Sequence, residues 1–320
     1  MTDQQSWETQ VFKYPDLFHT NEAAGFTGPG AIDPDGDLIK TSFTTDNILH
    51  QENGAPVSIL TMHRFHADGG QDTLLEEQYP ADVDAGIAVV IDHSQTFLDG
   101  DEVEHVAISH MACPSGRMVF AKMTSSGSVV TEPSFGACPP LPKETASWKE
   151  VGLTSYSEDA IVRIDDTFVA ITQVYYQNKE WASLPAEQPT EFLYQAWSFV
   201  LDREGQPVAA PTLIAQSNER NVYDRYTSGY NTGLAWNGKV LGWCRNNWAT
   251  RSVVFQGLDR LGRSIGDPQV LLEYDGDQIG VSCDTIALED NVFLSAFNIF
   301  YYDHQDTQLW VAYARVEDVR

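Results

Sequence analysis

The chain has 320 residues, 42% of them hydrophobic and 11% aromatic, which is the composition of a globular protein with a large buried core. Its formal net charge of -27 argues against nucleic acid and anionic membranes as partners, because phosphate groups are bound by clustered Lys and Arg. No apolar run is long enough to span a bilayer, and the opening stretch MTDQQSWETQ lacks the basic and apolar regions of a secretory signal. We therefore expect a cytoplasmic protein or the mature form of a secreted one.

Short runs of β-branched and aromatic residues, separated by turns rich in Gly, Asp, Asn and Pro, continue along the whole chain. Helical periodicity is nearly absent. This pattern predicts an all-β protein. The first expected strand is Glu8–Tyr14, with the sequence ETQVFKY.

A hairpin motif then recurs along the chain. Its copies are GAIDPDGDLIKTSFTTDN from Gly30, the looser QTFLDGDEVEHVAISHMA from Gln95, DAIVRIDDTFVAITQVYY from Asp159, NTGLAWNGKVLGWCRNN from Asn231 and DTIALEDNVFLSAFNIFYY from Asp284. The last three align without gaps through Asp165-Asp166, Asn237-Gly238 and Asp290-Asn291. These pairs predict two-residue hairpin turns, because Asp, Asn and Gly tolerate a positive φ.

A second motif, consisting of a strand, a polar turn with Gly and another strand, follows each hairpin. Its clearest copies are LDREGQPVAAP (Leu201–Pro211) and LDRLGRSIGDP (Leu258–Pro268). FHADGG (Phe65–Gly70) and MTSSGSVVTEP (Met123–Pro133) occupy the same place in earlier units. We interpret these turns as structural and assign them no function.

Each unit is therefore a four-stranded meander with an apolar face, and radial stacking of such units gives a β-propeller. We predict one five-bladed propeller domain over residues 1–320, with blades at about 28–80, 85–142, 150–216, 221–274 and 277–320. The last unit lacks an outer strand. Glu8–Tyr14 resembles the outer strand DPQVLLEY (Asp267–Tyr274), so the N-terminal segment is expected to close the last blade. The alternative is six blades, with Ile87–Ile91 opening the extra one.

Four cysteines and two histidine pairs are candidates for disulfides or metal ligands. Cys113 and Cys138 flank one predicted strand pair and could form a disulfide, whereas Cys244 and Cys283 lie in apolar strands and are interpreted as buried thiols. His63 and His66 are at an odd separation on a strand, as are His105 and His110, so neither pair forms a metal site by itself. No Cys/His spacing indicates zinc.

The functional site is expected on the rim where the inner strands begin, because the residues there differ between units while the scaffold repeats. Asp159 (preceded by Glu158), Asn231 and Asp284 stand at these positions, with Asp84 or Asp92 in the second unit. Converging carboxylates raise one another's pKa or bind a cation, so Ca²⁺ or another cation on the propeller axis is the one cofactor considered. Paired carboxylates also carry out glycoside hydrolysis.

The stretch EDAIVRIDDTF (Glu158–Phe168) resembles a motif of the five-bladed propeller glycosidases and glycoside phosphorylases. This resemblance implies that Asp159 lies in a catalytic cleft. With it, we assign Asp159, Asp284 and Glu158 as candidate catalytic residues.

Aromatic and polar side chains of the rim loops suit a sugar, which presents apolar C–H faces and hydroxyl edges. The candidate ligand contacts are Trp181, Tyr226, Tyr230, Asn231, Arg245, Asn246, Trp248 and His304. We expect a small-molecule or glycan ligand in a single rim pocket, and a glycoside hydrolase-like activity. A non-catalytic lectin or protein-interaction propeller, and an enzyme of unrelated chemistry, remain alternatives. The oligomeric state is left open.

Overall fold

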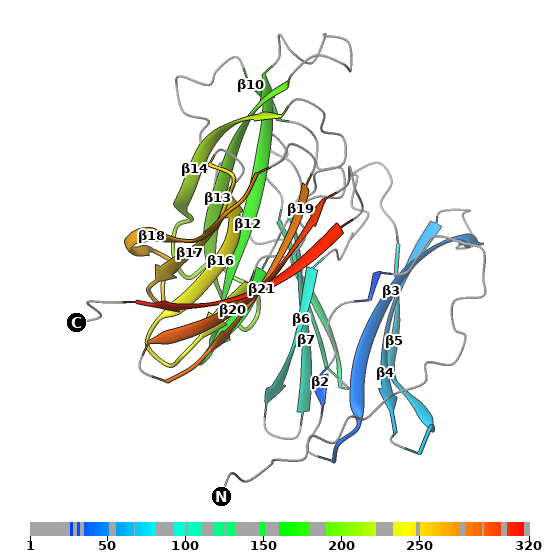
Figure 1. The fold of residues 1–320 in the computed structure, drawn as a ribbon. Helices are drawn as coiled ribbons and strands as arrows, with labels where there is room; N and C mark the ends of the chain where they lie inside the picture. The colour runs from blue at the N-terminus through cyan, green and yellow to red at the C-terminus, as the bar shows by residue number, and fades with distance from the viewer. Residues whose placement is uncertain are drawn as a thin grey trace, which may run out of the picture. The chain divides into compact units, whose positions relative to one another are not determined.

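The prediction of an all-β protein is confirmed by the computed structural model, whose described residues form antiparallel sheets and contain no helix (Figure 1). The described residues are 26–27, 31–32, 35–50, 56–66, 68–80, 93–99, 102–110, 118–124, 126–131, 148–150, 160–178, 190–221, 233–247, 250–275, 279–289, 291–301 and 306–316. Within these ranges, no helix has the length and apolarity that a membrane crossing needs. The expected strands at Glu8–Tyr14 and Ile87–Ile91 lie outside them.

Five sheets, named here in sequence order, contain the described strands. The first has β1 (Phe26–Thr27), β2 (Ala31–Ile32), β3 (Leu38–His50), β4 (Pro56–Phe65) and β5 (Gln71–Pro80), and the second has β6 (His93–Asp99), β7 (Glu102–His110), β8 (Met118–Thr124) and β9 (Gly127–Thr131). The third has β10 (Trp148–Glu150), β11 (Ala160–Ile164), β12 (Thr167–Asn178), β13 (Thr190–Asp202) and β14 (Thr212–Asn221). The fourth has β15 (Gly233–Trp236), β16 (Leu241–Asn247), β17 (Ser252–Leu258) and β18 (Ser264–Glu273), and the fifth has β19 (Ile279–Ala287), β20 (Val292–Tyr301) and β21 (Asp306–Arg315).

The chain divides into two compact units. One comprises Met1–Val106 and Lys122–Val129 and contains the first sheet. The other comprises Ala107–Ala121 and Val130–Arg320 and contains the third, fourth and fifth sheets. The five-bladed ring and its blade boundaries therefore stay predictions.

Within the second unit, the fourth sheet packs between the third and the fifth. Trp243 and Leu241 of β16 pack with buried residues of the third sheet, such as Val169. The next residue, Cys244, points to the opposite face and joins a cluster with residues of the fifth sheet. This alternation is the two-residue period of a strand. Every residue of β17 is buried as a result of packing on both faces.

Only one of the three predicted two-residue hairpin turns joins its two strands directly at the predicted pair. Asp165-Asp166 does join β11 to β12 directly, and Asp165 has a φ of 50°. By contrast, four residues separate β15 from β16 and β19 from β20. At Asn237 the side-chain Oδ1 accepts the backbone N–H groups of Lys239 and Val240, at 2.9 and 2.8 Å. The backbone N–H of Asn237 also bonds the carbonyl of Val240 at 3.2 Å, so the two residues enclosed by this bond are Gly238 and Lys239, one position later than predicted.

The turns at 66–70, 202–206 and 259–263 have the same backbone hydrogen bonds. In each, the first residue donates its N–H to the carbonyl four residues later, at 2.8 to 2.9 Å. The N–H three residues along, always of a glycine with positive φ, donates back to the first residue's carbonyl. Asp202 and Asp259 add side-chain bonds to their own turns. The recurring LDRxG pattern is thus a turn-forming device.

His66 stands where the other two turns have Asp. Its Nδ1 lies 2.7 Å from Oδ2 of Asp37 and its Nε2 lies 3.0 Å from Oδ2 of Asp72. Hydrogen bonds to these two carboxylates, first to Asp72 and then to Asp37, raise the pKa of His66 above 6.5. Through these two contacts the imidazole ties the turn after β2 to the start of β5.

We predict that this tie makes the stability of the protein depend on pH. A raised pKa stabilises the fold fully below pH 6.5, and the stabilisation is lost as pH rises through the raised value. In urea denaturation on both sides of pH 6.5, the free energy of unfolding should fall with rising pH in the wild type and not in His66→Gln. His63→Gln is the control. Burial lowers the pKa of His63, so the contribution of this residue to stability is lost as pH falls and not as pH rises. Identical pH profiles for the wild type and His66→Gln would contradict the prediction.

Candidate functional site

The inner strands of three successive sheets are neighbours. β15 contacts both β11 and β19. The first residue of β15 is Gly233, and a Cβ built there would lie 2.7 Å from the Cα of Asp284. No larger residue fits, since the obstacle is the β19 backbone itself. Gly233 was not among the predicted site residues, although its place two residues after Asn231 marks the strand start.

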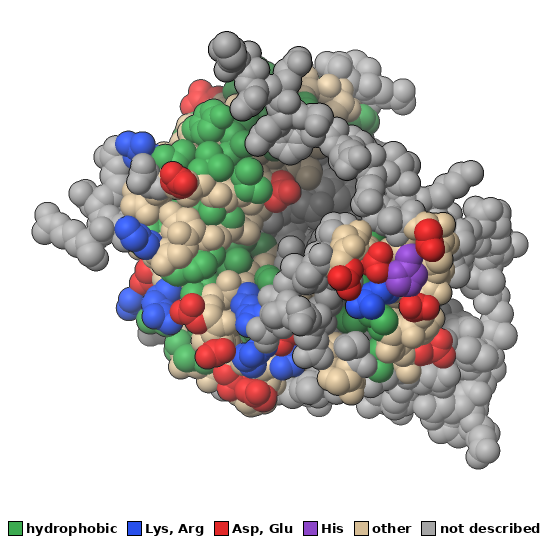
Figure 2. Space-filling view, turned by 90° about the horizontal axis from the view of Figure 1, so that it is seen from below, with side chains coloured by type: hydrophobic (Ala, Val, Ile, Leu, Met, Phe, Trp, Pro, Cys, Tyr) green, Lys and Arg blue, Asp and Glu red, His purple; other side chains and the backbone are tan. Residues whose placement is uncertain are grey.

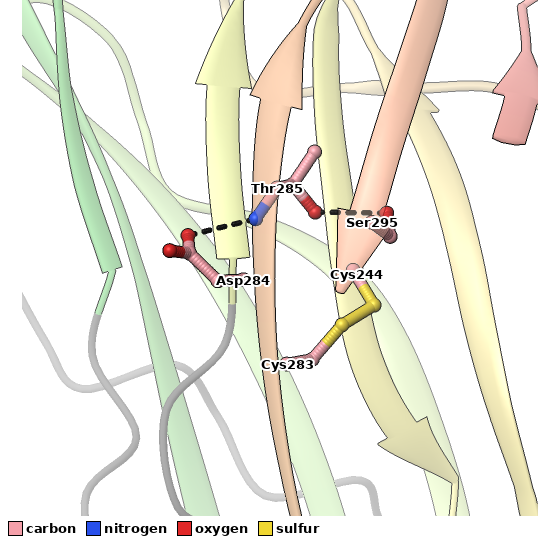
Figure 3. Close-up of a disulfide and its surroundings, with 5 residues drawn as sticks. All are labelled: Cys244, Cys283, Asp284, Thr285 and Ser295. Carbon is pink, nitrogen blue, oxygen red and sulfur yellow. Dashed lines mark hydrogen bonds between the residues drawn. A yellow bond between two sulfur atoms is a disulfide. The ribbon is translucent and has the colours of Figure 1, made fainter. Parts of the chain in front are cut away.

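Asp284 is the one candidate catalytic residue within the described ranges, and its side chain is exposed. Its Oδ1 accepts the backbone N–H of Thr285 at 2.7 Å. Figure 3 shows the carboxylate on the side of β19 away from the disulfide of the neighbouring Cys283. The alignment predicted Asp284 at the first position of its strand, and this prediction is wrong. β19 begins at Ile279, because residues 279–283 already pair with β20.

Cys244 and Cys283 form a disulfide, which corrects the interpretation of both residues as buried thiols (Figure 3). The bond joins β16 to β19, whose Cα atoms are 6.0 Å apart at this point. Both cysteines are buried in the cluster between the fourth and fifth sheets. The predicted bridge between Cys113 and Cys138 lies outside the described residues.

Arg245 and Asn246 are buried rather than open on the rim, with only 6% of each residue exposed. The Arg245 guanidinium lies 5.1 Å from the ring centroid of Trp243, and its Nη1 donates to the carbonyl of Asn246 at 3.1 Å. The Oδ1 of Asn246 accepts the hydroxyl of Tyr274 at 2.5 Å. Both side chains thus have internal partners, and their contact with a ligand stays a prediction.

The end of β16 also holds buried polar atoms for which no hydrogen-bond partner is found among the described residues. They are Nε1 of Trp243, Nδ2 of Asn246 and Oδ1 of Asn247. Such atoms are costly to bury, so they are usually paired with water, a ligand or neighbouring chain. Trp248, which follows Asn247, lies outside the described residues. In the sequence, the run Trp-Cys-Arg-Asn-Asn brings polar residues into an otherwise apolar strand, and this pattern could have indicated the buried polar atoms.

The other predicted site residues lie outside the described ranges. They are Glu158, Asp159, Trp181, Tyr226, Tyr230, Asn231, Trp248 and His304, together with Asp84 and Asp92. Asp159 directly precedes Ala160, the first residue of β11. Among described residues no group of three or more His, Cys, Asp and Glu side chains could hold a metal ion. The axial cation stays a prediction.

Comparison with known proteins finds no matching family model and no curated protein of similar sequence. Solved structures are similar at low identity. An α-L-arabinanase from Penicillium chrysogenum, complexed with arabinobiose, is 10% identical with a TM-score of 0.42, covering 92% of this chain and 94% of its own. A GH43_1 enzyme from Xanthomonas citri is 9% identical with a TM-score of 0.37, covering 94% and 90%. An α-L-arabinofuranosidase from Lactobacillus brevis is 8% identical with a TM-score of 0.36, covering 89% of each chain.

None of these likenesses reaches a TM-score of 0.5, so they carry no argument about this chain.

Proposed function

We propose that the chain is a five-bladed β-propeller whose rim binds a carbohydrate or a similar polyhydroxylated small molecule and hydrolyses its glycosidic bond. One observation supports this most directly. The exposed carboxylate of Asp284 lies on a strand whose backbone touches Gly233, where the loop carrying Tyr226, Tyr230 and Asn231 enters β15. β15 contacts both β11 and β19, so Asp159 and Asn231 adjoin or closely precede strands that neighbour each other, and one of these strands contacts the strand of this carboxylate.

In this proposal Asp159 and Asp284 are the two catalytic carboxyl groups. The protonated one donates its proton to the glycosidic oxygen as the bond to the leaving group breaks. The ionised one either removes a proton from an attacking water or attacks the anomeric carbon itself. Glu158, adjacent to Asp159 in the sequence, is the third carboxyl group of the proposed site. The rim aromatics pack against the sugar face, and Asn231 with His304 bonds its hydroxyls.

The proposal is tested with Asp159→Asn and Asp284→Asn, assayed on a panel of aryl glycosides and oligosaccharides. Each change removes a proton-transferring group but keeps its shape, so turnover should fall by about 10²–10⁴-fold. Asp267→Asn is the matched control, because Asp267 is an exposed acid on the outer strand β18. Circular dichroism and thermal melting check that each variant folds like the wild type.

Turnover that survives in both variants would overturn the catalytic assignment. A glycan array separates the remaining outcomes. Binding without turnover of any substrate favours the lectin alternative. The absence of both binding and turnover would contradict a carbohydrate site and favour unrelated chemistry on the same scaffold.

A further inference from the structure

A covalent anchor stands directly beside the exposed carboxylate of Asp284. Figure 2 shows Asp and Glu side chains scattered among apolar and basic ones over one face of the molecule, so an exposed acid by itself marks no site. Asp284 follows Cys283, whose sulfur is bonded to Cys244 of β16 (Figure 3). Because neighbouring residues of a strand alternate, the two side chains leave β19 on opposite faces. The disulfide therefore anchors the backbone from which the carboxylate projects.

Three strands meet at the level of this anchor. Cys244 pairs with Gly233 of β15, and a Cβ at Gly233 would lie 2.7 Å from the Cα of Asp284. The disulfide and this close backbone contact thus join the same stretch of β19 to two adjacent strands of the fourth sheet. Both cysteines lie in a buried cluster, with 0% of Cys244 and 2% of Cys283 exposed. Interiors packed this closely transmit a displacement of one strand to its neighbour.

Hydrogen bonds around Asp284 tie its carboxylate to the fifth sheet. Its Oδ1 accepts the backbone N–H of Thr285 at 2.7 Å, and the hydroxyl of Thr285 lies 3.0 Å from Oγ of Ser295 on β20. These bonds fix the carboxylate relative to its own sheet. Its place relative to β15 depends instead on how β19 is held against the fourth sheet, and at this level the disulfide is the covalent link.

We propose that the disulfide between Cys244 and Cys283 is a positioning device, which holds the Asp284 carboxylate at a fixed place beside the start of β15. This inference rests on the proposed function, in which Asp284 works together with Asp159. The two carboxyl groups of a glycosidase keep a set separation, and a misplacement of about 1 Å costs about 10²-fold in rate. Asp159 directly precedes β11, and β15 contacts both β11 and β19. The disulfide fixes one end of this arrangement.

Formation of this bond makes the activity depend on oxidative folding. The two thiols pass two protons and two electrons to a small-molecule disulfide such as glutathione disulfide, which becomes two thiols. Because both cysteines are buried in the folded protein, the exchange takes place while the chain is still open, and burial afterwards shields the bond from reductants. We therefore expect full activity only from protein that has folded under oxidising conditions.

Hydrogen exchange tests the positioning without an assay of activity, in a double variant that combines Cys244→Ala with Cys283→Ala. The amide of Thr285 donates to the Asp284 carboxylate, and in the double variant it should exchange at least about tenfold faster, relative to the amides of β17, than in the wild type. Phe293→Ala is the matched control, because Phe293 is fully buried in the other cluster between the same two sheets. Unchanged exchange of Thr285 in the double variant overturns the proposal. Equal acceleration in the control does so as well, because it would indicate a general loosening.

Kinetics of the same variants separates this inference from the proposed function. On a glycoside that the wild type hydrolyses, kcat of the double variant should fall at least about tenfold while KM changes less than about threefold, because a reacting group is displaced and the sugar contacts remain. Phe293→Ala should keep its kcat. Wild type refolded with a dithiol should behave like the double variant, and refolding with glutathione disulfide should restore kcat.

The outcomes of the two measurements differ for the two proposals. An unchanged kcat in the double variant overturns the positioning role and leaves the proposed function standing. If the wild type hydrolyses no glycoside, the proposed function fails, and the exchange of Thr285 alone decides whether the disulfide positions Asp284.

Discussion

Replacing Cys244 and Cys283 together by alanine is expected to lower the free energy of unfolding by roughly 4 kcal/mol. The two residues are 39 apart in sequence, and a cross-link over such a loop removes about this much conformational entropy from the unfolded chain. The link also joins two different sheets, so its loss affects the packing of β16 against β19. Both side chains are buried, and alanine leaves no polar atom behind.

The measurement is urea denaturation of the wild type and the double variant. The wild type unfolded and refolded with a dithiol reductant should reproduce the midpoint of the double variant. Ser282→Ala, one residue from Cys283 and only partly buried, is the control for disturbance of β19. If reductant leaves the wild-type midpoint unchanged, the two thiols are not bonded, and the expected loss of stability does not occur.

Phe293→Ala is the second change with a large expected effect, about 3–5 kcal/mol of lost stability. Phe293 is fully buried, and its ring centroid lies 5.2 Å from that of Phe255. Its ring edge also fills the space in front of Gly242. A Cβ at Gly242 would lie 2.5 Å from Cδ1 of Phe293 and 2.8 Å from Cε2 of Phe255. Gly242→Ala should therefore cost about 1–3 kcal/mol through overpacking.

Combining the two substitutions tests this contact directly. Because the methyl group that Gly242→Ala introduces enters the space that Phe293 vacates, the double variant should lose clearly less stability than the sum of the two single variants. The three free energies of unfolding, measured in urea, give the coupling. Gly238→Ala serves as the control, because its Cβ would meet nothing within 4 Å and its cost comes only from the φ of 91°. Simple additivity of Gly242→Ala and Phe293→Ala would refute the packing described here.

Local sequence patterns predicted the features that depend on neighbouring residues. The all-β content follows from alternating apolar residues and frequent turn residues, and strands form wherever such a run is long enough. The LDRxG turns were predictable because a glycine at positive φ and an Asp side chain that caps backbone N–H groups act within five residues. The outer strand DPQVLLEY was predicted because a short apolar run directly follows such a turn.

Features that depend on contacts between sheets were predicted less well. The alignment of Asp159, Asn231 and Asp284 treated the three strand starts as equivalent, yet β19 begins five residues before Asp284 because its partner β20 continues to Tyr301. Arg245 and Asn246 were expected on the rim. Both are buried, Arg245 beside Trp243 and Asn246 against Tyr274, and the sequence of one strand does not show such contacts.

The sequence by itself determined most of the described strands and the recurring turns, since these arise from hydrogen bonds and backbone preferences within a few residues. Only the tertiary structure decided that Cys244 meets Cys283, that Gly233 makes room for the backbone at Asp284, and that β21 keeps an unpaired edge among the described strands. These are contacts between side chains and strands far apart in the chain. They depend on the order in which sheets stack, and the periodicity of one strand carries no information about its neighbour.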